Sequence, residues 1–113
     1  MPNIPTIRLL LVDDHPVLRA GLANVLNYEP GITVVAEADD GATAIALWRT
    51  LRPDVMLLDL SMAGMDGIET LERLRAEFPD ARVLMLTSSE APEDVRHALK
   101  AGAGGYVTQN VRR

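Results

Sequence analysis

Residues 7–16 read IRLLLVDDHP, and the order of these side chains is typical of an α/β protein. The segment Ile7–Val12 is apolar except for Arg8, and it is continuous enough for a strand that is buried on both faces of a sheet. Two acids, Asp13 and Asp14, follow directly. Pro16 suits the first turn of a helix, where a missing backbone N–H costs nothing. The stretch therefore predicts a buried strand that leads through two acids into a helix.

The alternation of strand and helix continues along the chain. Further strands are predicted at 32–38, 55–60, 82–87 and 105–108, and further helices at 41–51, between 66 and 78, and at 92–101. Strict alternation with short connections indicates a parallel sheet with right-handed crossovers and helices on both faces. A fifth helix is expected after the fifth strand, but the sequence ends at Arg113. We therefore expect either that the chain is a fragment or that one face of the sheet is partly bare.

The amino-acid composition limits the classes of protein to which the chain can belong. The chain has 113 residues, enough for one domain with a single core. Only 4% of the residues are aromatic, so aliphatic side chains and methionines, Met56 and Met85 among them, are expected to fill that core. The sequence contains no cysteine, which excludes a disulfide scaffold, a thiolate nucleophile and a zinc–sulfur site.

Charge and hydropathy exclude further classes of protein. A formal net charge of −5 argues against a chain that grips nucleic acid by itself, because that affinity comes largely from lysine and arginine. No apolar run approaches the roughly 20 residues that span a bilayer. The first residues do not resemble a signal peptide. We therefore expect a cytoplasmic protein without membrane contact.

Polar side chains stand where four of the five predicted strands end. They are Asp13 and Asp14 after the first strand, Asp59 in the third, Thr87 in the fourth and Gln109 after the fifth. In an open α/β sheet, ligands bind at the carboxyl ends of the strands. If the first, third and fourth strands are neighbours, three carboxylates converge, and their repulsion requires a cation or raised pKa values. Carboxylate oxygens suit Mg²⁺ better than zinc or another transition metal.

A simpler interpretation is that each aspartate caps the helix that follows it. Capping accounts for Asp13 or Asp14 taken singly, but it accounts poorly for three acids that all stand at strand ends. His15 lies between the acids and Pro16. We expect it at a helix start on the rim of the site, in a structural role and not in catalysis.

Four segments carry a resemblance to a known family. They are LLLVDDHPVLRAGL at 9–22, PDVMLLDLSMAGMDGIE at 53–69, VLMLTSSE at 83–90 and ALKAGAGGYV at 98–107. Together they resemble the receiver domain of two-component response regulators. They are most similar to the LuxR/NarL/FixJ-type branch, whose members carry a C-terminal helix-turn-helix DNA-binding domain.

The resemblance implies a flavodoxin-like, doubly wound sheet of five parallel strands in the order 2-1-3-4-5. It runs from Ile7 to about Gln109, so we expect residues 1–113 to form a single receiver domain without an output domain. Residues 1–6 are then a flexible N-terminus. Residues 110–113 are the start of a truncated fifth helix or a linker.

The resemblance also implies a role for each polar residue at the strand ends. A histidine kinase would phosphorylate Asp59. Mg²⁺ would be bound by Asp14, Asp59 and the backbone carbonyl of Ser61, with Asp13 as a supporting acid. The remaining implied positions are a switch hydroxyl at Thr87, an aromatic switch at Tyr106, and residues that tune the lifetime of the phosphorylated state at Ser61 and Ser89.

Two positions depart from the family pattern. Gln109 stands where the family has a lysine, and Ala63 stands where it usually has a proline. Gln109 can donate a hydrogen bond but brings no charge. One hypothesis is therefore a phosphorylation-dependent receiver, and the alternative is a degenerate receiver that acts through its surfaces. An aspartyl phosphatase fits poorly, because Ser61 stands where such an enzyme has a second aspartate.

The expected partners follow from these two hypotheses. A histidine kinase donates the phosphoryl group, and a second copy of the chain forms a homodimer. DNA is contacted only through an output domain outside this chain. The domain is then a signalling protein, not an enzyme, whose chemistry is limited to its own phosphorylation and dephosphorylation.

Overall fold

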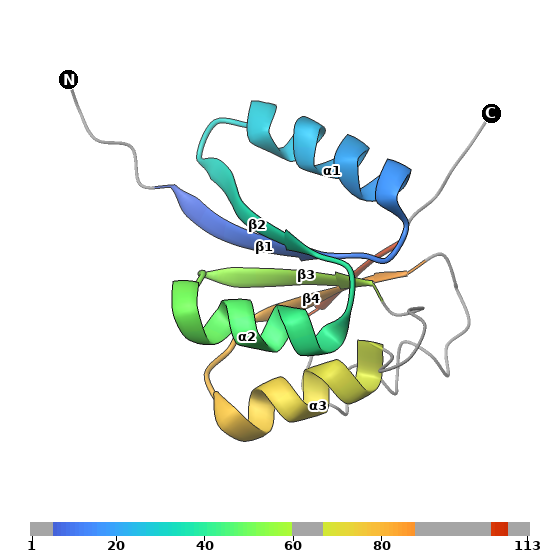
Figure 1. Cartoon of the computed structure of the whole chain (residues 1–113). Coiled ribbons are helices and arrows are strands. Elements are labelled where there is room, and N and C mark those ends of the chain that lie inside the picture. Colours follow the sequence, from blue (N-terminus) through green and yellow to red (C-terminus); the bar gives the residue numbers. More distant parts are fainter. Residues whose placement is uncertain (1–5, 60–66, 88–104, 109–113) are drawn as a thin grey trace.

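The computed structural model describes residues 6–59, 67–87 and 105–108 (Figure 1). Within these ranges the elements alternate as the sequence predicts. In chain order they are β1 (Ile7–Val12), α1 (Pro16–Tyr28), β2 (Ile32–Ala38), α2 (Gly41–Leu51), β3 (Val55–Asp59), α3 (Gly67–Glu77), β4 (Val83–Thr87) and β5 (Gly105–Thr108). The strands form one parallel sheet in the order β2-β1-β3-β4-β5, which confirms the predicted order.

Most predicted bounds agree with the structure. The bounds of β2, α2 and β5 coincide with the predicted ranges, while β4 begins at Val83, one residue later than predicted. The helix predicted at 92–101 lies outside the described residues, as does position 60 at the end of the predicted third strand.

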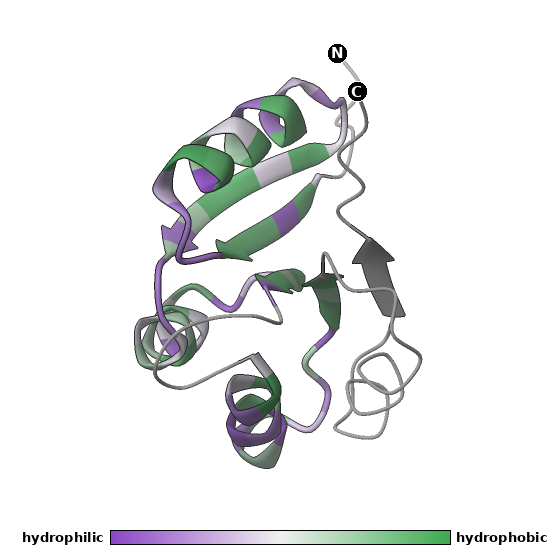
Figure 2. Cartoon of the chain, turned by 90° about the vertical axis from the view of Figure 1, so that its right-hand side faces the viewer, coloured by the Kyte–Doolittle hydropathy of each residue, from purple (hydrophilic) through white to green (hydrophobic). Residues whose placement is uncertain are grey.

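The sheet has a core on each face because successive side chains of its central strands point to opposite faces. In β1, Leu10 and Val12 point toward α2 and α3, where Trp48, Leu71 and Leu74 complete the larger core. Met56 and Met85 are fully buried there, as predicted. Burying one side chain of this size stabilises the fold by about 1.5–3 kcal/mol. Figures 1 and 2 show α2 and α3 together on this side of the sheet.

The second core lies between the sheet and α1. Leu9, Leu11, Leu57 and Leu86 are buried on this face, with Ala23 of α1 against them. Only this one residue of the helix is buried. The face is more open at the amino ends of the strands. There Ile7 is 49% exposed, and Val55 and Leu84 are half-buried.

Local signals set the ends of α2. Asp40 Oδ1 accepts a hydrogen bond from the backbone N–H of Thr43 at 2.7 Å, which satisfies a free donor of the first turn. At the other end Arg52 adopts the left-handed conformation, with φ 46°, and Pro53 follows. A left-handed residue before a proline stops the helix there, and this brings the chain into β3.

None of the helices in the described part of the chain combines the length and the apolar character of a membrane span.

Candidate functional site

The carboxyl ends of β1 and β3 meet at one edge of the sheet. Val12 pairs with Leu58, so the residues that follow them, Asp13 and Asp59, are neighbours. Asp59 in turn pairs with Leu86 of β4, which places the main chain of Thr87 at the same edge. The first, third and fourth strands are therefore adjacent, which is the condition on which the predicted cluster of acids depended.

The acids do converge. One ligand atom from each of Asp13, Asp14, His15 and Asp59 lies within 4.8 Å of every other. The side chains of Asp13 and Asp59 are buried, at 0% and 4% exposure of the residue. Asp14 is half-buried, and His15 closes the cluster from the solvent side. Buried like charges this close together favour a bound cation.

His15 contacts all three acids. Its Nδ1 lies 2.7 Å from Asp13 Oδ1, 3.2 Å from Asp14 Oδ1 and 3.5 Å from Asp59 Oδ2. The hydrogen bond with Asp13, followed by the charge of that carboxylate, raises the pKa of His15 above its ordinary value. The predicted place at a helix start is confirmed, since His15 is the N-cap of α1. Its contact with the acids was not predicted.

The main chain around Asp13 is held by an arginine that sequence reasoning also missed. Arg19 Nη1 donates to the backbone carbonyl of Asp13 at 2.8 Å, and Arg19 Nε donates to Glu37 Oε1 at 3.1 Å. Arg19 thus ties the end of β1 to α1 and β2. The one sequence feature that could have indicated this contact is the position of Arg19, one turn into the helix that is predicted after Asp13.

Helix capping does not account for the cluster. Asp13 Oδ1 accepts from the backbone N–H of His15, which is itself the N-cap residue and precedes the helix. Asp59 is separated from α3 by the segment 60–66, so it is not adjacent to a helix start. The simpler interpretation, that these two acids serve only as caps, therefore fails.

The donor set fits a divalent cation. Asp13 Oδ2 is buried and has no hydrogen-bond partner among the described residues. A buried carboxylate oxygen without a partner is costly, and a bound cation removes that cost. Oxygens from Asp13, Asp14 and Asp59 provide the hard ligands that Mg²⁺ prefers.

The other predicted site residues are described in part or not at all. Thr87 is the last residue of β4 and pairs with Thr108, and Tyr106 pairs with Met85. Both assignments concern the main chain. Ser61, Ala63, Ser89 and Gln109 lie outside the described residues, so their predicted roles stay predictions.

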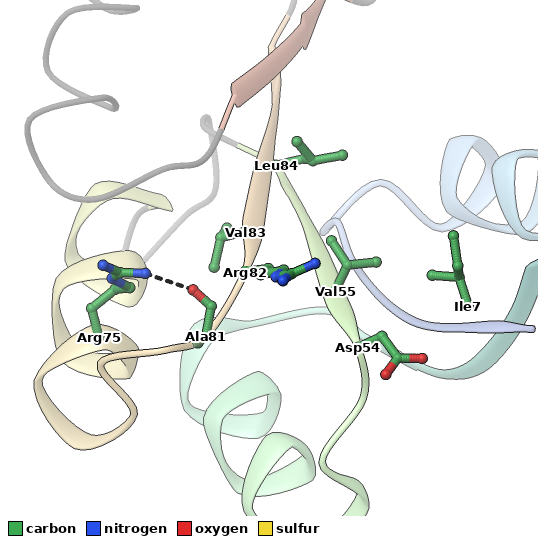
Figure 3. A pocket seen from close by; sticks show the side chains of 8 residues that line it. All are labelled: Ile7, Asp54, Val55, Arg75, Ala81, Arg82, Val83 and Leu84. Atoms are coloured by element: carbon green, nitrogen blue, oxygen red, sulfur yellow. Dashed lines mark hydrogen bonds between the residues drawn. The ribbon is translucent and has the colours of Figure 1, made fainter.

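Two cavities lie at opposite ends of the sheet. An open depression of about 520 Å³ lies beside the acids, against Asp14, His15 and the exposed Val17. A groove of about 640 Å³ lies at the amino ends of the strands, where Ile7, Val55 and Leu84 point into it (Figure 3). The groove contains none of the clustered acids and is remote from the candidate site.

Comparison with known proteins assigns the family. The model of the response regulator receiver domain matches residues 9–113, so this chain belongs to that family. It is 46% identical over 110 residues to the nitrate/nitrite response regulator protein NarP of Escherichia coli, covering 97% of this chain and 51% of that protein. It is 44% identical over 101 residues to the transcriptional regulatory protein LiaR of Bacillus subtilis, covering 89% and 48%. The chain spans about half the length of these curated relatives.

Solved structures agree with this assignment. A LuxR-family two-component response regulator from Aurantimonas superposes with a TM-score of 0.90 at 40% identity, over 93% of this chain and 75% of that one. A signal receiver domain from Mycobacterium tuberculosis gives a TM-score of 0.88 at 37% identity, over 96% and 87%. The flavodoxin-like receiver fold and the NarL/LuxR type are thus confirmed. A receiver domain is a signalling domain and not a classical enzyme.

Proposed function

We propose that this receiver domain accepts a phosphoryl group on Asp59 from a histidine kinase. The observation that carries the proposal is the convergence of Asp13, Asp14 and Asp59, with the carboxylate of Asp59 buried at the carboxyl end of β3. A carboxylate oxygen of Asp59 attacks the phosphorus of the phosphohistidine. The P–N bond breaks, and the released imidazole takes up a proton. The product is an acyl phosphate on Asp59.

The surrounding acids hold the cation that this transfer requires. Asp14, Asp59 and the backbone carbonyl of Ser61 would bind Mg²⁺, and Asp13 would support them as a further acid. When bound, the cation neutralises charge that develops on the phosphoryl oxygens. The backbone carbonyl of Asp13 accepts a hydrogen bond from Arg19, and its carboxylate accepts one from the backbone N–H of His15. The main chain that carries the acids is therefore held in place before the phosphoryl donor binds.

Thr87 and Tyr106 would report the phosphorylated state. Thr87 stands at the end of β4, beside the strand of Asp59, which supports a hydrogen bond from its hydroxyl to the phosphoryl group. Movement of Thr87 would open space for Tyr106, whose strand β5 is paired with β4. One local charge change would thus bias a two-state element.

Gln109 supports a second candidate function. The family has a lysine at this position, and a glutamine brings no charge to the site. A degenerate receiver would keep the fold and act as a protein-interaction or dimerisation module without phosphorylation. Beryllofluoride titration followed by NMR separates the two. A switching receiver shifts the Thr87 and Tyr106 resonances together, whereas a module that acts through its surfaces leaves Tyr106 unshifted.

The wider role follows from the relatives. Response regulators of this type receive phosphoryl groups from histidine kinases and carry DNA-binding output domains. Because the matched relatives are about twice as long as this chain, we propose that the receiver controls a transcriptional output domain. DNA would be contacted by that domain and not by the acidic receiver.

Intact mass after incubation with Mg²⁺ and acetyl phosphate tests the acceptor. The parent should gain one phosphoryl group, and Asp59→Asn should gain none. Asp80→Asn is the matched control, because it removes an exposed acid from the turn before β4 and should behave as the parent. Phosphorylation that survives Asp59→Asn overturns the assignment.

A further inference from the structure

We propose that His15 Nδ1 is a direct ligand of the cation at this site, which makes the site selective for borderline transition-metal ions such as Co²⁺ and Zn²⁺ over Mg²⁺. The inference rests on the proposed metal site and adds a nitrogen to its oxygens. The sequence alone predicted a site of oxygen donors only. The structure places an imidazole among them.

The distances from His15 to the acids are close to those between adjacent ligands in an octahedral site. With bonds of about 2.1 Å, adjacent ligand atoms lie about 3.0 Å apart and opposite ones about 4.2 Å apart. His15 Nδ1 lies 2.7, 3.2 and 3.5 Å from one oxygen each of Asp13, Asp14 and Asp59. All four donor atoms fall within 4.8 Å of one another, so the widest separation would shorten slightly when a cation binds. The nitrogen therefore occupies a position beside all three carboxylates, as an adjacent ligand does.

The backbone keeps the imidazole there. The N–H of His15 donates to Asp13 Oδ1 at 2.8 Å, and the carbonyl of His15 accepts from the N–H of Arg19 at 2.8 Å. The residue is thus anchored between the buried acid and the first turn of α1. A cation that replaces the proton shared by Nδ1 and Asp13 Oδ1 can bind with little rearrangement of the main chain.

The ring nitrogen changes which cations the site prefers. Mg²⁺ takes oxygen ligands and keeps several waters, whereas neutral imidazole is a good ligand for zinc and neighbouring transition metals. Asp13 Oδ2, which is buried without a hydrogen-bond partner among the described residues, supplies a further anionic donor. Three carboxylates and one imidazole form a mixed nitrogen and oxygen site.

The competing possibility is that the ring only covers the acids. The side chain of His15 is 60% exposed, so it has room to turn away when a cation enters. In that case the ring competes with every cation alike. Its removal would then tighten Mg²⁺ and Co²⁺ binding in parallel. A direct ligand predicts a different result, because its removal weakens Co²⁺ binding much more than Mg²⁺ binding.

Calorimetric titration with Mg²⁺ and with Co²⁺ distinguishes these cases. It is carried out on the parent, on His15→Gln and on the control His97→Gln, which changes the other histidine of the chain. The titrations are run well above the raised pKa of His15, so that its imidazole is neutral. We expect His15→Gln to lose at least about 10-fold in Co²⁺ affinity, since even outer partners of metal ligands contribute 10–100-fold. Mg²⁺ affinity should change by less than about 2-fold, and His97→Gln should match the parent.

A spectroscopic readout accompanies the affinities. The Co²⁺ absorption spectrum should change between the parent and His15→Gln, because loss of a nitrogen ligand alters the ligand field. Parallel changes in both affinities, or an unchanged spectrum, overturn the inference. If Mg²⁺ binds the parent and supports phosphorylation in that case, the proposed function stands. If no cation binds the parent, the proposed function fails together with this inference.

Discussion

Asp13 is fixed by its surroundings before any ligand arrives. Its backbone N–H donates to the carbonyl of Ala38 at 3.0 Å, its carbonyl accepts from Arg19, and its Oδ1 accepts from His15. These bonds come from β2, α1 and the residue before α1. A site that is held by neighbouring elements in this way has its geometry set in advance, so little ordering is needed when a cation or phosphoryl group binds.

Gln109 leads to a prediction that distinguishes Mg²⁺ binding from the phosphorylation-dependent switch at Thr87 and Tyr106. A lysine there would add a unit charge, and two unit charges about 4 Å apart interact by roughly 4 kcal/mol at an effective dielectric near 20. A glutamine offers a hydrogen bond with a net contribution of about 0.5–1.5 kcal/mol. We expect Gln109→Lys to strengthen the coupled shift of Thr87 and Tyr106 in beryllofluoride NMR titrations.

The same variant should not bind Mg²⁺ more tightly, because an ammonium in the position that the family resemblance implies would compete with the cation for the acids. Calorimetry on the parent and Gln109→Lys checks this expectation. Markedly tighter Mg²⁺ binding in the lysine variant contradicts it.

How far the site follows from the sequence depends on the kind of contact. Asp13, Asp14 and Asp59 were predicted to converge if their strands are neighbours, and the strand order that the resemblance implies meets this condition. The contacts of His15 and Arg19 depend on side-chain rotamers and on the angle at which α1 leaves the sheet, and neither leaves a periodic signal in the sequence. The hydrogen bond from Arg19 to the carbonyl of Asp13 is visible only in three dimensions.

At the scale of elements, the best predicted segments are those with strong local signals at both ends. Helix α2 has a capping Asp40 before it and Pro53 after it, and its predicted bounds coincide with the observed ones. Helix α1 shows the limit of periodicity. Val25 follows Leu18 and Leu22 at helical spacing, yet it is 61% exposed because only a narrow side of the helix meets the sheet.

The N-cap of α2 leads to a stability prediction. Asp40→Ala removes the acceptor for the N–H of Thr43 and should lower the free energy of unfolding by about 1 kcal/mol near neutral pH. Chemical denaturation measures the difference. Asp40→Asn is the matched control, since asparagine is also a good cap and should lose less.

The effect of Asp40 should depend on pH. The hydrogen bonds from Thr43 lower the pKa of Asp40 below its ordinary value of 3.8, so the folded state favours the ionised form. The stabilisation is therefore fully present above that value and is lost as the pH falls through the lower, folded-state pKa. The gap between the parent and Asp40→Ala should narrow in acid. A gap that is constant with pH argues against the ionised cap.

The C-cap of α2 gives a second prediction at this scale. Arg52 has a positive φ of 46°, which glycine adopts without the steric penalty of a Cβ. Arg52 also stacks over Phe78, with its guanidinium carbon 4.5 Å from the ring centroid. Arg52→Ala and Arg52→Gly both remove this stacking, but only glycine relieves the backbone. We expect Arg52→Gly to be more stable than Arg52→Ala by about 1 kcal/mol. Equal melting temperatures of the two variants would show that the left-handed residue is not strained.

At the scale of the whole molecule, the two ends of the sheet differ. The carboxyl ends carry the clustered acids, while the amino ends carry a groove that Ile7, Val55 and Leu84 line together with Asp54 and two arginines (Figure 3). Strict alternation of strands and helices was enough to predict the layers, and the resemblance to receiver domains supplied the strand order. It could not predict which apolar side chains would be left open, because that depends on how far each helix extends over the strands.

The open apolar side chains lead to a prediction about association. Ile7 is the most exposed apolar residue of the groove, at 49%, and exposed apolar surface favours association. We expect the mass measured by light scattering to rise with protein concentration, and Ile7→Lys to reduce that rise, because association would bury its charge. Val17→Lys adds the same charge on α1, where Val17 is 88% exposed and lies outside the groove, and it should associate as the parent does. A parent that stays strictly monomeric at high concentration contradicts the prediction. If Ile7→Lys and Val17→Lys reduce association equally, the effect comes from net charge and not from the groove.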